Sequence, residues 1–244
     1  MAKKHDTLVF IPAWNEEDNL AAVLHELRTE LPDADVLVVD DGSTDRTPHI
    51  AREQGAQVLS FGENRGLRAA IAAGYGYAAE NGYEYCGRVD ADGQHPVEEL
   101  RKLIDVVRAG KSDVAVGSRY ATAGGNGFSR ERYKTSPARR LGTGLLRRSM
   151  EVVLDRPFHD ATSGMYAVNA KAMPILAQPY TSGAPEVEAV LRLHDEGLRV
   201  DEHPVEMRER ASGESKLQGK KALVLVLTVA GTLITAEALR RRRR

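Results

Sequence analysis

The 244-residue chain has little cysteine and no long apolar leader. Cys86 is its only cysteine, so no disulfide can form within the chain and nothing requires an oxidising compartment. The first residues run directly into an apolar stretch at 8–11, without the long apolar core and small-residue cleavage site of a signal peptide. These absences predict a protein that is not exported and works in a reducing, cytoplasmic setting.

Several nucleotide-binding and nucleic-acid-binding signatures are also missing. Where a dinucleotide fold would carry Gly-x-Gly-x-x-Gly, the chain reads Ile11-Pro12-Ala13-Trp14-Asn15-Glu16-Glu17, which disfavours a nicotinamide oxidoreductase. The Walker A lysine motif is absent too. No zinc-ligand spacing, aromatic RNA-binding motif or basic-leucine pattern accompanies the basic residues, so no nucleic-acid partner is expected.

The composition, 42% hydrophobic and 28% charged, is that of a soluble globular protein with one substantial core. The net charge of −1 hides an uneven distribution, because residues 216–244 carry +7 and residues 1–215 carry −8. A second basic cluster lies between residues 130 and 148, where seven basic side chains face only Glu131. Both segments favour an anionic partner, and the phosphate groups of a lipid or a nucleotide fit best.

Short apolar runs alternate with helical patterns through the first half of the chain. The strand candidates are residues 8–11, 36–39, 57–61, 85–89 and 113–117, and the helical patterns fall at 20–31, 45–54, 67–80 and 96–109. The apolar spacing changes from buried strand to amphipathic helix and back. This alternation predicts an α/β fold with a mostly parallel central sheet flanked by helices.

Polar residues follow three of these strand candidates. Asn15 and Glu16 come after the first, Asp40 and Asp41 after the second, and the acidic stretch 90–95 after the strand candidate at 85–89. Capping of the following helix explains each group in isolation. The carboxyl ends of parallel strands meet at one edge of a sheet, where ligands bind, so the three groups together predict a polar nucleotide crevice.

The most informative of these groups is the stretch Asp90-Ala91-Asp92-Gly93-Gln94. Strand side chains alternate faces, so Asp90 and Asp92 are expected on the same side, with a turn at Gly93 bringing the Gln94 amide oxygen alongside. Hard oxygen ligands of this kind suit Mg2+ or Mn2+ held against phosphate. A solvated turn is the alternative, since Asp and Gly are common turn residues.

Seven short motifs follow one another along residues 6–217. They are Ile11-Pro12-Ala13-Trp14-Asn15-Glu16, Val39-Asp40-Asp41-Gly42-Ser43-Thr44-Asp45, Asn64-Arg65-Gly66, Asp90-Ala91-Asp92-Gly93-Gln94-His95-Pro96, Gly117-Ser118-Arg119-Tyr120, Asp160-Ala161-Thr162-Ser163-Gly164 and Arg210-Ala211-Ser212-Gly213-Glu214-Ser215-Lys216-Leu217. In this order they resemble the family 2 glycosyltransferases, in particular the polyprenyl-phosphate sugar synthases of the dolichol-phosphate mannose synthase type.

The resemblance implies a GT-A type nucleotide-sugar-binding fold over residues 1–217. It implies metal-dependent, inverting transfer of a sugar from a GDP- or UDP-sugar to a polyprenyl phosphate, with the Mg2+ or Mn2+ held by Asp90, Asp92 and Gln94. The nucleotide pocket would be lined by Pro12, Asn15, Glu16 and Asp41. The cations expected around the donor and acceptor phosphates are Arg119, Arg132, Arg210 and Lys216.

An acceptor phosphate is already anionic at neutral pH, so it needs positioning more than deprotonation by a general base. Glu186 and Glu188 follow Pro185 at a helix start and are interpreted as acids that suit the helix dipole rather than as catalytic groups. Two departures from the family pattern, Arg68 and the pair Met165-Tyr166, are expected near the donor site. The sugar is therefore left open.

The last part of the chain, residues 218–244, is expected to form an apolar helix with a polyarginine end. Its uncharged stretch, 222–236, would span ~22 Å as a helix, short of the roughly 30 Å hydrocarbon core. The flanking basic residues suit an anionic membrane surface or a small membrane partner protein, which predicts a peripheral location at the cytoplasmic face of the membrane. Contact with the body of the protein, or with a second copy in a homo-oligomer, is the alternative.

Two other functions stay open from the residues alone. One is a family 2 glycosyltransferase that acts on a saccharide or another hydroxyl acceptor, which would need a base carboxylate near the acceptor. The other is a non-catalytic nucleotide-binding adaptor at the membrane surface. Asp90, Asp92, Gln94 and Arg119 are all present, so nothing in the sequence supports loss of activity.

Overall fold

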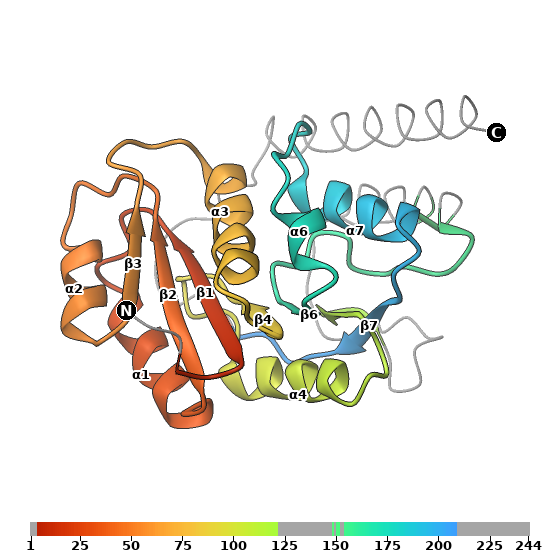
Figure 1. The fold of residues 1–244 in the computed structure, drawn as a ribbon, viewed down its shortest axis with the longest axis horizontal. Helices are drawn as coiled ribbons and strands as arrows, with labels where there is room; N and C mark the ends of the chain where they lie inside the picture. The colour runs from red at the N-terminus through yellow and green to blue at the C-terminus, as the bar shows by residue number, and fades with distance from the viewer. Residues whose placement is uncertain (1–3, 122–147, 149, 152–153, 209–244) are drawn as a thin grey trace.

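The computed structural model of the chain describes residues 4–121, 148, 150–151 and 154–208. Its strands are β1 (Thr7–Ala13), β2 (Ala34–Asp40), β3 (Gln57–Ser60), β4 (Tyr85–Arg88), β5 (Val114–Ser118), β6 (Tyr166–Asn169) and β7 (Val200–Pro204). Its helices are α1 (Leu20–Glu30), α2 (Thr47–Glu53), α3 (Leu67–Glu80), α4 (Val97–Arg108), α6 (Met173–Leu176) and α7 (Pro185–Asp195). Figure 1 shows these helices on both faces of one twisted sheet, as predicted.

The strands form a seven-stranded sheet in the order β3-β2-β1-β4-β6-β5-β7. All pairings are parallel except those of β6, which runs antiparallel to β4 and to β5. The chain leaves β1 toward β2 and β3 on one side and returns to β4 on the other, so the strand order reverses between β1 and β4. Such a reversal opens a crevice beyond the carboxyl ends of the strands, and the predicted polar groups follow three adjacent strands there.

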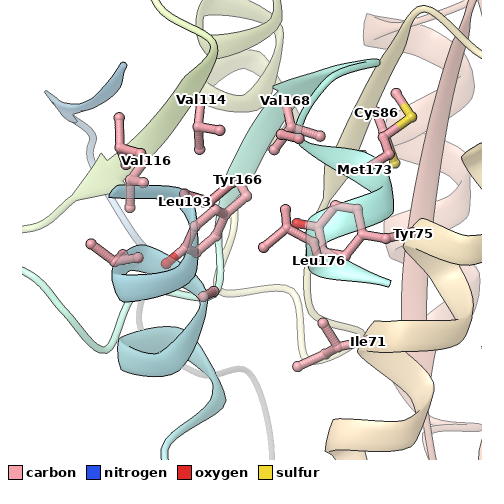
Figure 2. Close-up of a cluster of buried hydrophobic side chains, with 14 of the residues drawn as sticks. Ile71, Tyr75, Cys86, Val114, Val116, Tyr166, Val168, Met173, Leu176 and Leu193 are labelled. Carbon is pink, nitrogen blue, oxygen red and sulfur yellow. The ribbon is translucent and has the colours of Figure 1, made fainter. Parts of the chain in front are cut away.

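The core has two layers, one on each face of the sheet, and β1 shows why. All seven residues of β1 are buried, and its side chains alternate: Leu8 and Phe10 join the layer under α3, whereas Val9 and Ile11 join the layer under α1 and α4. The close approach of α3 to β1 depends on Gly74, because a Cβ there would lie 2.3 Å from the Phe10 ring. Figure 2 shows part of the layer that contains Leu8 and Phe10. In this layer the side chains of Tyr166, from β6, and Leu193, from α7, pack in the same cluster.

Helix α4 follows the predicted pattern closely. Its apolar face is fully buried and consists of Val97, Leu100, Leu103, Ile104 and Val107. Pro96 stands at the N-cap, one residue before the helix, and the first turn carries two acids, which suit the positive end of the helix dipole. The helix therefore starts directly after the acidic turn and fixes one side of it.

The predicted order of strands and helices is confirmed for the first half of the chain, with boundaries within two or three residues. Strands β6 and β7 and the short helix α6 were not predicted. The C-terminal segment 218–244 lies outside the described residues. In the part of the chain that the structure describes, no helix combines the length and the apolar character needed to cross a membrane.

Candidate nucleotide and phosphate site

The loop that follows β1 is tied to the loop that follows β2 through Asn15. The Asn15 side-chain oxygen accepts a hydrogen bond from the Thr44 N–H at 2.8 Å, and the Asn15 N–H donates to Ser43 Oγ at 3.0 Å. Asn15 has a φ of 52°, a left-handed conformation that Asn tolerates better than most residues. This exposed residue thus holds two loops of the crevice in register.

Glu16 and Pro12 belong to the same edge. The Glu16 N–H donates to Thr47 Oγ1 at 2.8 Å, and its carboxylate accepts from the Asn19 side chain at 3.0 Å. Pro12 lies in β1 beyond Phe10, the last residue that pairs with β4, so its missing N–H costs no bond on that side. Both residues therefore lie at the carboxyl end of β1.

Asp41 holds the loop 63–66 against the end of β2. Its carboxylate is 4% exposed and accepts hydrogen bonds from the Arg65 N–H at 2.7 Å and the Gly66 N–H at 2.9 Å. The neighbouring Gly42 has a φ of +68°, and a Cβ there would lie 2.2 Å from the Glu63 carbonyl carbon, so only glycine fits. Asp41 thus fixes the conformation of the loop 63–66 at the carboxyl end of β2.

The acidic segment after β4 turns at Gly93, whose φ is +74°. The Asp92 carboxylate accepts from the Gln94 N–H at 3.1 Å and is nearly buried, whereas the Asp90 side chain is 38% exposed. The Asp90 N–H donates to Nδ1 of the buried His95 at 3.0 Å. Burial lowers the pKa of His95, partly offset by Asp90 and Asp92. A neutral imidazole that accepts at Nδ1 carries its proton on Nε2, 4.0 Å from Asp90 Oδ2.

Arg119 forms a two-point ion pair with Asp160. Its Nε and Nη2 atoms each lie 2.7 Å from an Asp160 oxygen, and Nη2 also donates to Thr162 Oγ1 at 2.9 Å. Burial favours the neutral form of Asp160, but Arg119 outweighs this and lowers the pKa of the carboxyl group. The Asp160 N–H donates a hydrogen bond to Glu202 Oε1 at 2.6 Å. The guanidinium of Arg119 is thus held in place by Asp160 and Thr162.

A second ion pair stands behind the acidic turn. Arg88, the last residue of β4, places Nη2 3.5 Å from Asp90 Oδ1 and 3.2 Å from Glu186 Oε1 at the start of α7. Burial raises the pKa of Glu186, and Arg88 opposes that shift. The sequence contains one signal for this pair, because a charged residue at the end of a buried strand needs a partner.

The departures at Arg68, Met165 and Tyr166 have different outcomes. Arg68 Nη1 donates to the Ser182 carbonyl oxygen at 3.0 Å, so it links the start of α3 to the segment before α7. Met165 and Tyr166 are both buried and pack in the core. Glu188 accepts the N–H groups of Thr181 and Ser182, in line with its interpretation as a helix-start acid.

The described residues thus bring Pro12, Asn15, Glu16, Asp41, Asp90, Asp92, Gln94 and Arg119 to loops at the carboxyl edge of the sheet or beside it. Arg132, Arg210 and Lys216 lie outside the described residues. His95 and Asp160 lie within the sequence motifs without a predicted role of their own, and the pairing of Arg88 with Glu186 was not predicted.

The oxygen donors of the turn fit a divalent cation held jointly with phosphate. Within the described part of the chain, no three His, Cys, Asp or Glu side chains come close enough to hold a cation by themselves. Mg2+ in particular is usually bound by one or two carboxylates together with substrate phosphates rather than by an all-protein cage. Two carboxylates, of which Asp90 is partly exposed, meet that requirement.

The fold of the described residues is that of the GT-A glycosyltransferases. Crystal structures of glucosyl-3-phosphoglycerate synthase from Mycobacterium tuberculosis share the fold; one in complex with Mn2+, UDP and phosphoglyceric acid superposes with a TM-score of 0.67 at 20% identity, covering 94% of this chain and 78% of that chain. The family model "Glycosyl transferase family 2" matches residues 8–172. The chain belongs to glycosyl transferase family 2.

Two relatives extend the similarity over most of the chain. The polyprenol monophosphomannose synthase of Mycolicibacterium smegmatis is 32% identical over 234 residues, covering 92% of this chain and 85% of the relative. The undecaprenyl-phosphate mannosyltransferase of Micrococcus luteus is 32% identical over 220 residues, covering 87% of each. The predicted family resemblance is confirmed.

Proposed function

We propose that the chain transfers a hexose from a nucleotide sugar to a polyprenyl phosphate. The observation that carries the proposal is the acidic turn 90–94 at the strand-order reversal, in a chain that is 32% identical over most of its length to a polyprenol monophosphomannose synthase and to an undecaprenyl-phosphate mannosyltransferase. The donor would lie across the loops of Asn15 and Asp41, with its diphosphate toward Asp90 and Asp92.

The leaving group of this reaction is a nucleoside diphosphate, which gains negative charge as the sugar departs. A divalent cation, when bound, neutralises charge on the diphosphate oxygens. The protein's own part is positioning: Asp92 is fixed by the Gln94 N–H, and Arg119 is fixed by Asp160. Arg132, Arg210 and Lys216 are proposed to complete the cationic surroundings of the acceptor phosphate, which attacks the anomeric carbon directly and inverts it.

We further propose that the protein works at the cytoplasmic face of the membrane, because its proposed acceptor is a lipid. The basic segment 218–244 would contact anionic headgroups or a small membrane partner. Chains with and without residues 218–244 should therefore differ in binding to acidic liposomes. Equal binding would remove the proposed role of this segment.

The decisive assay incubates the full chain with Mg2+ or Mn2+ and a panel of GDP- and UDP-sugars, in separate arms with a short polyprenyl phosphate, with a saccharide and without acceptor. Mass spectrometry should show a polyprenyl-phosphate monosaccharide in the first arm. Product only in the saccharide arm would instead establish the hydroxyl-acceptor alternative. Nucleotide binding without product in any arm would favour the adaptor.

The variant Asp92→Ala tests the role of the acidic turn in the same assay. It should abolish product while leaving the thermal unfolding temperature within a few degrees of the wild-type chain. Asp105→Ala, an exposed aspartate on α4, serves as the matched control and should retain full turnover. Undiminished turnover of Asp92→Ala would refute the assignment of this carboxylate.

A further inference from the structure

Arg88 is a buried charged residue at the end of a strand, β4, that has no other charged residue. It ends β4, pairs in register with Phe10 of β1 and Tyr166 of β6, and is 3% exposed. Its Nε is buried and has no hydrogen-bond partner among the described residues. Charged side chains are almost never fully buried unless they are paired. The role of Arg88 can therefore be inferred from its partners.

Both partners are carboxylates, and one nitrogen serves both. Arg88 Nη2 lies 3.5 Å from Asp90 Oδ1 and 3.2 Å from Glu186 Oε1. Glu186 comes from α7, is 98 residues away in sequence, and has a side chain that is 17% exposed. The guanidinium is therefore shared between the partly exposed carboxylate of Asp90 and the less exposed carboxylate of Glu186.

This sharing has an electrostatic consequence for any cation near Asp90. A lone buried guanidinium at this distance would neutralise Asp90 and repel a divalent cation, because charge interactions across a few ångströms are strong where water is excluded. Glu186 supplies the second negative charge, which compensates Arg88. Asp90 then keeps its charge for a ligand on its exposed side, while Arg88 still holds the carboxylate in place.

We infer that Glu186, acting through Arg88, is a positioning residue that keeps Asp90 competent to bind a divalent cation. The inference rests on the proposed function only in taking Asp90 as a cation ligand. It makes Arg88 and Glu186 one unit: loss of Glu186 alone leaves an uncompensated positive charge beside Asp90, whereas loss of both charges restores the balance.

The experiment titrates Mn2+ into the full-length chain at about pH 8 with GDP or UDP present, because the cation is expected to be held jointly with phosphate. Free Mn2+ is followed by electron paramagnetic resonance against a protein-free blank that contains the same nucleotide. Glu186→Gln, which preserves the side-chain volume, should weaken Mn2+ binding about tenfold, since a change of ~1.4 kcal/mol is tenfold. The double variant Arg88→Met/Glu186→Gln should recover affinity to within about threefold of the wild-type chain. A purely structural ion pair would lose further affinity in the double variant.

The matched control is Asp113→Asn. Asp113 is also a nearly buried carboxylate paired with an arginine, Arg199, but it precedes β5 at the opposite edge of the sheet. Its substitution should leave Mn2+ affinity unchanged. If the chains carrying Arg88→Met do not fold, Glu186→Asp decides, because it keeps the charge and should hold the affinity within about threefold, against about tenfold for Gln.

Two results would overturn the inference. Glu186→Gln that binds Mn2+ as tightly as the wild-type chain would show that the charge of Glu186 does not reach Asp90. Weakening in the folded double variant that equals or exceeds the weakening in Glu186→Gln would show a structural role alone. A wild-type chain that binds no more Mn2+ than Asp92→Ala would instead refute the cation site itself, and with it the metal dependence of the proposed function.

Discussion

The Arg119 guanidinium meets the Asp160 carboxylate edge to edge, with Nε and Nη2 each 2.7 Å from one of the two oxygens. Asp160 has a fully buried side chain and Arg119 is 23% exposed. A bidentate pair of this kind fixes the plane of the guanidinium as well as its position. Arg119 was predicted to bind phosphate. Because Asp160 fixes its guanidinium, substitutions of Asp160 test how much this ion pair contributes to stability.

Asp160→Asn should destabilise the protein by about 3 kcal/mol, because removing one partner of a buried pair leaves the other charge uncompensated. Urea denaturation followed by circular dichroism measures the change. Asp201→Asn is the matched control: Asp201 pairs with Arg156, but both side chains are more than a third exposed, so the loss should stay under about 1 kcal/mol. Equal losses would contradict the burial argument.

The stability contributed by Asp160 should depend on pH in one direction. The pKa of its carboxyl group is lowered below the ordinary 3.8 in the folded protein, so the folded state favours the charged form. The contribution is therefore full above 3.8 and is lost as the pH falls through the lowered folded value. The stability difference between the wild-type chain and Asp160→Asn should be constant from about pH 8 to 5 and should shrink below about pH 4.

Gly164 lies against the acidic turn, and its substitution should damage the site but not the fold. A Cβ at Gly164 would lie 2.8 Å from Asp90 Oδ2 and 3.1 Å from His95 Cε1. The partly exposed Asp90 carboxylate must then move, so Gly164→Ala should lower kcat/KM at least about tenfold, the effect of ~1.4 kcal/mol. Steady-state kinetics at several Mn2+ concentrations measures it.

Gly76→Ala is the control for that prediction. Gly76 lies within α3, and a Cβ there would lie 3.8 Å from the Ala177 Cβ, an ordinary contact. Alanine in a helix interior should stabilise the protein by about 0.5–1 kcal/mol relative to glycine and leave turnover unchanged. Full activity of Gly164→Ala would show that the position of the Asp90 carboxylate does not depend on the space beside Gly164.

Asn15 should matter for nucleotide affinity because it joins two loops of the crevice. Asn15→Ala loses the bond to the Thr44 N–H and strains a φ of 52°, and should weaken GDP or UDP binding about tenfold, or ~1.4 kcal/mol. Asn15→Gly avoids the backbone strain but still lacks the hydrogen bond to the Thr44 N–H. Asn15→Asp keeps an acceptor oxygen for that bond. Isothermal titration calorimetry should therefore rank the affinities Asn, Asp, Gly, Ala, and equal affinities would refute the role.

The first half of the fold was predictable because its signals are local. Buried strands such as β1 are continuous apolar runs, and α4 carries its apolar residues at helical spacing, so each element is visible within about ten residues. Strand β6 was missed because it is only four residues long, and its antiparallel pairing with β4 and β5 depends on residues far away along the chain. Short apolar segments are ambiguous between strand, helix and loop.

The same division applies to the site. Local order in the sequence determined the acidic turn, its glycine and the family motifs, because these features depend on neighbours in the chain and on backbone conformation. Only the tertiary structure decided that Asp160 holds Arg119 and that Arg88 is shared by Asp90 and Glu186. Buried charges need partners, and the distant partners here, Glu186 for Arg88 and Asp160 for Arg119, are brought close by the packing of the fold rather than by spacing along the chain.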